Sequence, residues 1–205
     1  TQALSSAASD VYKRQLDANT TADSNTSCGF NNLTSNTTGA NNSAFGDNAL
    51  FANTTADNNT AMGFQSLLSN TTGASNVAVG ANALDSNTTA SFNSAFGKDT
   101  LQANTTGAQN TGIGQGALYA NTTADNNTAV GKSALGANTT GAQNTAVGAN
   151  ALDANTTEGY ITAIGYNSLS ANTTGTKGTA VGSGSLQQNT TCLLYTSDAA
   201  DDIAC

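Results

Sequence analysis

The sequence has no proline, tryptophan or histidine, and only 9% of its 205 residues are charged. Without histidine, the chain lacks the side chain that most often acts as a base near neutral pH. Five Lys and Arg residues against thirteen Asp and Glu residues give a formal net charge of −8, which disfavours binding to nucleic acid or anionic lipid. No apolar run reaches the roughly 18 residues that suggest a transmembrane helix.

Large apolar residues are also scarce, because aromatic residues make up 5% of the chain and there is one methionine. Asn, Thr, Ala and Gly dominate instead. The composition is too poor in large apolar residues for an ordinary globular core and too uncharged for an ordinary disordered region. Such a bias is typical of internal repeats.

The tripeptide Asn-Thr-Thr marks a 17-residue repeat without insertion or deletion, and we number the repeat from its Asn as position 1. The asparagines at position 1 are Asn19, Asn36, Asn53, Asn70, Asn87, Asn104, Asn121, Asn138, Asn155 and Asn172, with one more at Asn189. Position 11 is always glycine: Gly29, Gly46, Gly63, Gly80, Gly97, Gly114, Gly131, Gly148, Gly165 and Gly182. Position 15 is always leucine: Leu33, Leu50, Leu67, Leu84, Leu101, Leu118, Leu135, Leu152, Leu169 and Leu186.

Longer periods are nested in this repeat. Position 4 alternates between Ala and Gly as far as Glu158, so that every second repeat is alike. Position 16 carries an aromatic residue at Phe51 and again at Tyr119, four repeats further along the chain. We infer that the array grew by duplication, in which a 17-residue unit doubled and the resulting pair then doubled again.

An indel-free 17-residue repeat predicts an all-β fold, a parallel β-roll or β-solenoid of about ten coils with one repeat per coil. Along an extended strand, positions 8 and 10 would share one face and position 9 the other, and positions 15 and 17 would lie on a second strand. Glycine at position 11 would form one corner. Asn-Thr-Thr would form the other, because asparagine tolerates a left-handed conformation and can hydrogen-bond within its own turn. The alternative, a disordered low-complexity chain, does not require Gly and Leu to stay in register.

Stacking predicts a ladder of amide hydrogen bonds between the asparagines at position 1. The core is expected to contain the leucine and the apolar residue at position 10. Position 9, which is nearly always alanine, would either face another chain at close approach or fill a narrow interior, and the sequence leaves both open. Because the core is thin, packing of several chains side by side would add stability.

The two ends do not follow the repeat. Ser5–Gln15 (SSAASDVYKRQ) resembles a translation of the transposase adaptor used to prepare short-read sequencing libraries. Cys192–Asp202 (CLLYTSDAADD) resembles a translation of the complementary strand, read one base out of phase. We therefore expect residues 1–15 and 192–205 to be adaptor-derived rather than native, and 16–191 to be the repeat array, cut within a repeat at both ends.

The array offers no recognisable catalytic, cofactor-binding or metal-binding set. Three of the lysines lie at variable positions: Lys98, Lys132 and Lys177. Three aspartates share position 5: Asp23, Asp57 and Asp125. These carboxylates lie at least two coils apart, too far for one metal ion, and are expected to be solvated corner residues. Cys28 occupies position 10 and is expected to be a small buried thiol.

Variable positions are where binding specificity would lie. Positions 16 and 6 carry isolated aromatic residues, which are candidate exposed contact residues: Phe51 and Tyr119, and Phe92 and Tyr160. Sequence drift at exposed positions explains them at least as simply.

The core motif N-T-A-V-G-x-x-A-L, as in Asn144–Leu152, resembles the S-V-A-I-G-x-x-A repeats in the heads of trimeric autotransporter adhesins, over all ten units of the array. The resemblance implies a left-handed parallel β-roll, a homotrimer, and a location on a bacterial outer surface with attachment to host matrix, cells or glycans. The array is also similar to those of tail-fibre proteins with a C-terminal self-cleaving chaperone, which would place it in a virion fibre. Its repeat is longer than in adhesin heads, and no stalk or anchor is visible.

We therefore expect a non-enzymatic adhesive or structural repeat region that takes no cofactor, binds no nucleic acid and does not itself insert into a membrane. A phage tail-fibre shaft is the alternative of the same structural class. An ice-binding solenoid is the alternative of another class, although adjacent threonines point to opposite faces and a flat T-x-T rank is absent.

Overall fold

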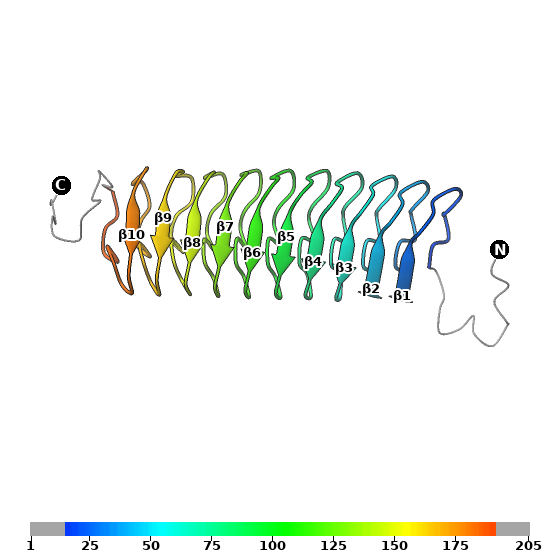
Figure 1. Ribbon diagram of the computed structural model, residues 1–205, viewed down its shortest axis with the longest axis horizontal. Coiled ribbons are helices and arrows are strands. Elements are labelled where there is room, and N and C mark those ends of the chain that lie inside the picture. The colour runs from blue at the N-terminus through cyan, green and yellow to red at the C-terminus, as the bar shows by residue number, and fades with distance from the viewer. Residues whose placement is uncertain (1–14, 192–205) are drawn as a thin grey trace.

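The computed structural model describes residues 15–191, which form a straight stack of coils (Figure 1). Of the two ends predicted to be adaptor-derived, all but Gln15 lie outside these described residues. The strands are β1 (Thr26–Phe30), β2 (Ser43–Asp47), β3 (Thr60–Met62), β4 (Val77–Val79), β5 (Ser94–Phe96), β6 (Thr111–Ile113), β7 (Thr128–Val130), β8 (Thr145–Val147), β9 (Thr162–Ile164) and β10 (Thr179–Val181). No helix within residues 15–191 has the length and apolar character needed to cross a membrane.

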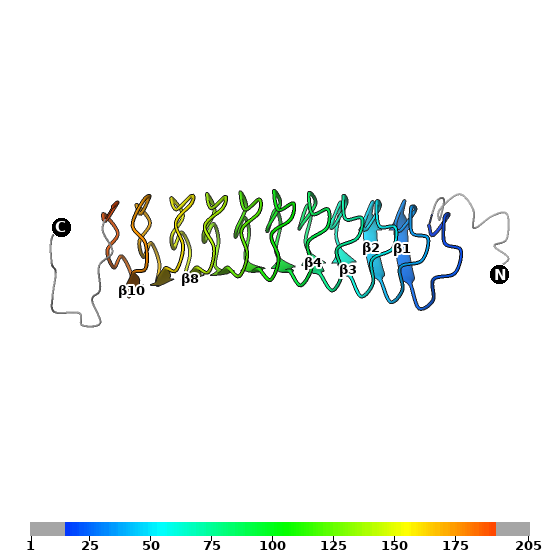
Figure 2. The same ribbon diagram turned by 90° about the horizontal axis from the view of Figure 1, so that it is seen from above.

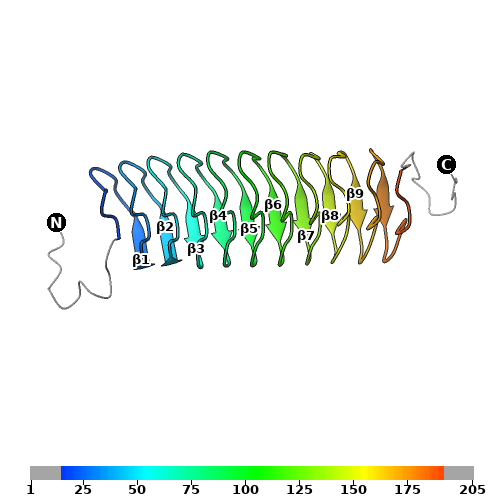
Figure 3. The same cartoon turned by 180° about the vertical axis from the view of Figure 1, so that it is seen from behind.

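The strands form one parallel sheet in sequence order, β1 to β10, and each strand pairs with the equivalent strand of the next repeat. Thr128 pairs with Thr145, for example, and Val130 with Val147. The strands lie along one side of the rod and the loops along the other (Figure 2), and the coils keep the same outline when seen from behind (Figure 3). This confirms the predicted all-β solenoid with one repeat per coil.

Each described coil contains one strand, which includes positions 8–10, so the predicted second strand at positions 15 and 17 is wrong. The chain returns through turns whose backbone amides still reach the next coil. Leu118 N donates to Ala134 O at 3.0 Å, and Thr122 N donates to Thr139 O at 3.0 Å. These turns therefore satisfy their backbone groups between coils without extended geometry.

Left-handed backbone conformations explain why the second side is not a strand. Positions 6, 13 and 15 have positive φ, and Leu118 at position 15 has a φ of 54°. A left-handed non-glycine residue costs about 1–2 kcal/mol, which the burial of the leucine side chain offsets. The asparagines at position 1 do not have positive φ, so that prediction is wrong.

Glycine at position 11 has φ between 123° and 141°; it directly follows strands β3–β10 and is the fourth residue of β1 and β2. A Cβ on Gly131 would lie 2.5 Å from the carbonyl carbon of Gly148 in the next coil. The corner therefore needs glycine both for its conformation and for the close approach of two backbones.

The core consists of the leucine at position 15 together with small side chains at positions 9 and 14. The alanines at position 9 are Ala44, Ala61, Ala78, Ala95, Ala129, Ala146, Ala163 and Ala180, all buried within the single chain. The interior is thus narrow, and this excludes the alternative in which position 9 faces another chain. Position 10 points outward, so the predicted core of leucine plus the position 10 residue is wrong: opposite the leucine there is room for a methyl group only.

Candidate interaction surfaces

The asparagines at position 1 form a continuous column inside the rod. Each Nδ2 donates to the Oδ1 of the preceding coil and to the carbonyl of its own position 4. For Asn104 these distances are 3.0 Å to Asn87 Oδ1 and 2.9 Å to Gly107 O. From Asn36 to Asn172 these side chains are completely buried. They are scaffold groups, since their amides are inaccessible to a ligand or to glycosylation.

A second column of asparagines, at position 7, is one that the sequence analysis missed. Asn110 N donates to Asn93 Oδ1 at 2.9 Å, and Asn110 Nδ2 donates to Ala124 O in the next coil at 2.8 Å. The buried members are Asn42, Asn59, Asn76, Asn93, Asn110, Asn127 and Asn144. The recurrence of Asn at position 7 could have revealed this column. Position 7 lies next to the strand, where the sequence was used only to predict the alternation of positions 8–10. The two columns fix the turn between positions 1 and 7 from both ends.

The outward side of the sheet, which we call the sheet face, consists of the residues at positions 8 and 10 in β1–β10. Position 8 carries Thr, Ser or Val. Position 10 carries Cys28, Phe45, Met62, Val79, Phe96, Ile113, Val130, Val147, Ile164 and Val181. The larger side chains of this column reach exposures between 36% and 66%. Cys28 is also exposed, so the prediction of a buried thiol is wrong, because position 10 lies outside the coil.

The predicted contact aromatics are exposed but do not gather into one cluster. Phe92 and Tyr160 are four coils apart at position 6, and Phe51 and Tyr119 are four coils apart at position 16. Further exposed aromatics at position 12 were missed: Phe30, Phe64 and Tyr166. Of the four predicted residues, Tyr119 is the one that lines the cavity described next.

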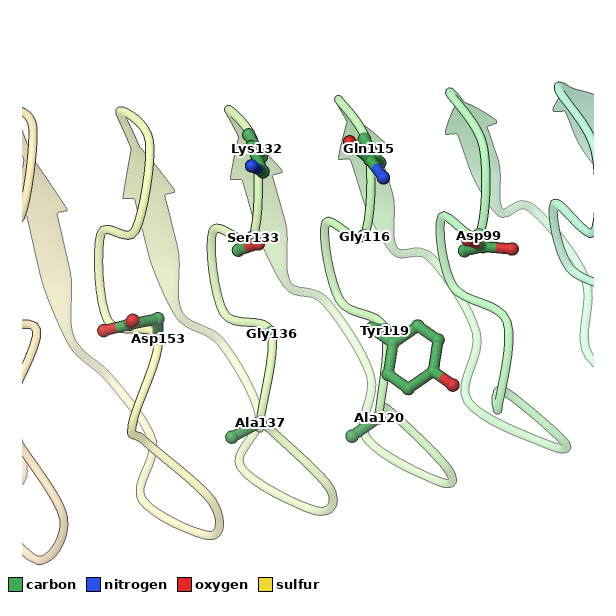
Figure 4. Close-up of a pocket in the computed structure, with 10 residues that line it drawn as sticks. All are labelled: Asp99, Gln115, Gly116, Tyr119, Ala120, Lys132, Ser133, Gly136, Ala137 and Asp153. Carbon is green, nitrogen blue, oxygen red and sulfur yellow. The ribbon is translucent and has the colours of Figure 1, made fainter.

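This cavity, which we call the Tyr119 hollow, lies over the turns of four neighbouring coils and has a volume of about 540 Å³ (Figure 4). Gly116 at position 13 and Gly136 at position 16 leave its floor without side chains. Tyr119 and Asp153 flank Gly136 in the coils before and after it. The remaining lining residues are Asp99, Gln115, Ala120, Lys132, Ser133 and Ala137.

The two carboxylates of the hollow differ in their surroundings. Asp99 Oδ2 lies 2.5 Å from Lys98 Nζ, and Asp99 Oδ1 accepts from Asn82 Nδ2 at 2.9 Å. These hydrogen bonds, that of Lys98 first, lower the pKa of Asp99. At Asp153, burial instead raises the pKa of the carboxyl. Asp99 is thus engaged within the protein, while Asp153 borders the hollow as the less well solvated carboxylate.

Aspartates at position 5 have a structural role that the sequence analysis did not include. Asp57 Oδ1 accepts from Ala40 N at 2.7 Å, and Asp125 Oδ1 accepts from Ala108 N at 2.7 Å. They are exposed, as expected of corner residues, and each also satisfies a backbone amide of the preceding coil. Among residues 15–191, no three His, Cys, Asp or Glu side chains come together as a metal site would require.

The fold defines this chain as a parallel β-solenoid with one 17-residue repeat per coil. Comparison with protein-family models, curated proteins and solved structures gives no match. The function therefore has to be argued from the surfaces of the rod itself.

Proposed function

We propose that this chain is the non-enzymatic repeat region of a bacterial surface adhesin, in which copies of the rod associate through the sheet face and present their outer turns for attachment. The observation that carries the proposal is the column at position 10, a row of apolar side chains that are exposed or half-buried along the whole sheet. Contiguous exposed apolar strips on soluble chains mark interaction sites.

We propose that the binding partner of the sheet face is a second copy of the same chain. A partner rod has the same spacing between coils, so its side chains can match every rung of the column, from β1 to β10. Positions 8 and 10 carry no charged residue, so copies can meet there despite the net charge of −8. A chain with one apolar face along its length is thus suited to a closed, symmetric bundle.

We infer the trimer, the outer-surface location and the adhesive role from the resemblance to trimeric autotransporter adhesins. A phage tail-fibre shaft, which would be built from the same kind of rod, remains the alternative of the same class. The gene region downstream distinguishes the two, since a membrane anchor indicates an adhesin and a self-cleaving chaperone indicates a fibre.

Light scattering coupled to gel filtration tests the association of the full chain under reducing conditions. We expect a mass of three chains, and a mass of one chain after Ile113→Asp together with Val130→Asp, because charges would then lie within the apolar column. Thr123→Asp, at an exposed position away from the sheet, is the matched control and should leave the mass unchanged. A monomeric wild-type chain with a cooperative melt would refute the proposal.

Ice binding is the second candidate, and one observation favours it. Threonines at position 8 face outward in register in β6–β10, beside the apolar column. Aromatic residues at position 10, such as Phe45 and Phe96, interrupt the flatness of this face in the first half of the rod. Thermal hysteresis of the purified protein tests this function, and its absence excludes it.

A further inference from the structure

We propose that the Tyr119 hollow is a binding site for a neutral sugar residue of a surface glycan. This inference rests on the proposed adhesive function and specifies its ligand class. It is carried by a cavity that combines an exposed aromatic ring, a floor of small residues, and hydrogen-bonding side chains at its rim (Figure 4).

The hollow arises from a coincidence of two glycines. Position 16 carries a glycine only at Gly136, and in the neighbouring coil Gly116 replaces the larger residue usual at position 13. Elsewhere in the array, apart from Gly184 at position 13, these positions carry side chains such as Gln102 or Asn150. The opening is therefore a local departure from the repeat, at one place along the rod.

The size and lining of the hollow suit a small polar ligand. The hollow is open to solvent rather than enclosed, and its volume of about 540 Å³ falls within the range of about 300–1,000 Å³ that is typical of ligand sites. Tyr119 is 49% exposed, and its ring offers an apolar face on which the C–H groups of a pyranose can pack, with a polar hydroxyl at its tip. Ala120 and Ala137 extend this apolar surface along the lower edge.

The polar side chains at the rim supply both kinds of hydrogen-bonding group. Asp153 accepts hydrogen bonds, while Lys132 donates them and Gln115 can do both. The charges of Lys132 and Asp153 offset each other, and Asp99 is already paired with Lys98. This balance favours a neutral, hydroxyl-rich ligand over a phosphate or another strongly anionic group.

The backbone of the site is preorganised, because its turns are hydrogen-bonded between coils. Ala120 N donates to Gly136 O at 3.1 Å, and Ala137 N donates to Asp153 O at 3.1 Å. A rigid site loses little conformational freedom on binding, which matters for a ligand as small as one sugar residue.

The experiment uses the 205-residue chain and the methyl glycosides of glucose, galactose, mannose and N-acetylglucosamine, observed by saturation-transfer NMR. We expect at least one of these to bind, with saturation strongest at the C–H groups of one ring face. Tyr119→Ala, and Gly136→Gln, which fills the hollow with a residue used at the same position in another coil, should each weaken binding at least about tenfold. Tyr160→Ala, which removes another exposed aromatic ring far from the hollow, is the control and should bind as the wild type does.

Two results would overturn the assignment. One is the absence of saturation transfer to all four glycosides at millimolar concentration. The other is binding that both Tyr119→Ala and Gly136→Gln leave unchanged, with circular dichroism showing that each variant is folded. If Tyr119→Ala instead dissociates the chains in light scattering, the hollow is a contact between copies and the sugar site is refuted. A monomeric wild type that still binds sugar would refute the trimer but not the site.

Discussion

Replacing one rung of the buried asparagine ladder gives a sharp test of the packing, and Asn104→Asp is the substitution we choose. Asn104 Nδ2 donates to Asn87 Oδ1 at 3.0 Å and to Gly107 O at 2.9 Å, while Asn104 Oδ1 accepts from Asn121 Nδ2 at 2.8 Å. A carboxylate of the same shape keeps the accepting role and loses both donors. The change therefore isolates the N–H groups of one rung.

The loss of stability can be estimated from the hydrogen bonds that each partner of Asn104 retains. Gly107 O keeps a second donor, Asn93 Nδ2 at 2.9 Å, whereas Asn87 Oδ1 loses its partner from this coil. One unpaired buried acceptor costs about 1–3 kcal/mol, and the desolvated carboxylate adds to it. We expect the free energy of unfolding to fall by about 3 kcal/mol at pH 7.

The pH dependence provides the internal check. Burial raises the pKa of the introduced carboxyl above its unfolded value of about 3.9. The destabilisation is therefore smallest below that value, where the protonated carboxyl can donate one bond, and it grows as the pH rises towards the folded pKa. At pH 3 we expect a residual loss of about 1 kcal/mol relative to the wild type.

Urea denaturation at pH 3 and pH 7, followed by circular dichroism, measures both values. Asn126→Asp is the matched control, because Asn126 lies at an exposed position of the same array and undergoes the same chemical change. The reasoning is refuted if Asn104→Asp loses no more stability than the control at pH 7, or if its loss is the same at both pH values.

Three further predictions concern the corner, the core and one titrating group. Gly131→Ala should lower the free energy of unfolding in urea by more than about 3 kcal/mol, because its Cβ would lie 2.5 Å from a backbone carbon of the next coil. Gly116→Ala is the control, since its Cβ meets no atom closer than 3.9 Å; it should cost about 1 kcal/mol for its left-handed conformation alone. Leu118→Ala should cost about 2–5 kcal/mol by opening a cavity in the core, while Leu68→Ala at the half-buried position 16 should cost less than about 1.5 kcal/mol. Asp153→Asn should raise the melting temperature at pH 7 and change it less at pH 3. Burial raises the pKa of Asp153, so the charged carboxylate destabilises the folded state only above the unfolded pKa. An equal change in melting temperature at both pH values would contradict this cause.

The coil itself could be predicted from the sequence, because Asn, Gly and Leu recur at positions 1, 11 and 15 without an indel. The alternation of positions 8, 9 and 10 was also predictable, but not which of the two faces points inward. Hydrophobicity favours position 10 for the core, whereas the structure buries the alanine at position 9. Variation in volume was the overlooked signal. Position 10 ranges from Cys28 to Phe45, a spread that a close-packed interior does not tolerate, whereas position 9 is almost constant.

The left-handed leucine was beyond prediction from local preference. Leucine rarely adopts positive φ, and the conformation at position 15 is held by burial inside the finished stack rather than by its neighbours in the chain. The Tyr119 hollow was predictable from the sequence only in part. The period places Gly136 beside Tyr119 and Asp153, but the contribution of Gly116 depends on where the turns lie in space.

The alternation at positions 4 and 5 bears on how the length of such a rod can change. Gly107 at position 4 has room for no Cβ, since it would lie 2.3 Å from Ala124 O in the next coil, and the aspartate that follows Ala124 supports the amide of Ala108. Neighbouring coils are therefore complementary rather than identical. A recombination event that adds two repeats preserves every such junction and lengthens the rod by about 9.6 Å, whereas one that adds a single repeat places two coils of the same kind together. Selection on these contacts would make the reach of the rod vary in steps of two coils.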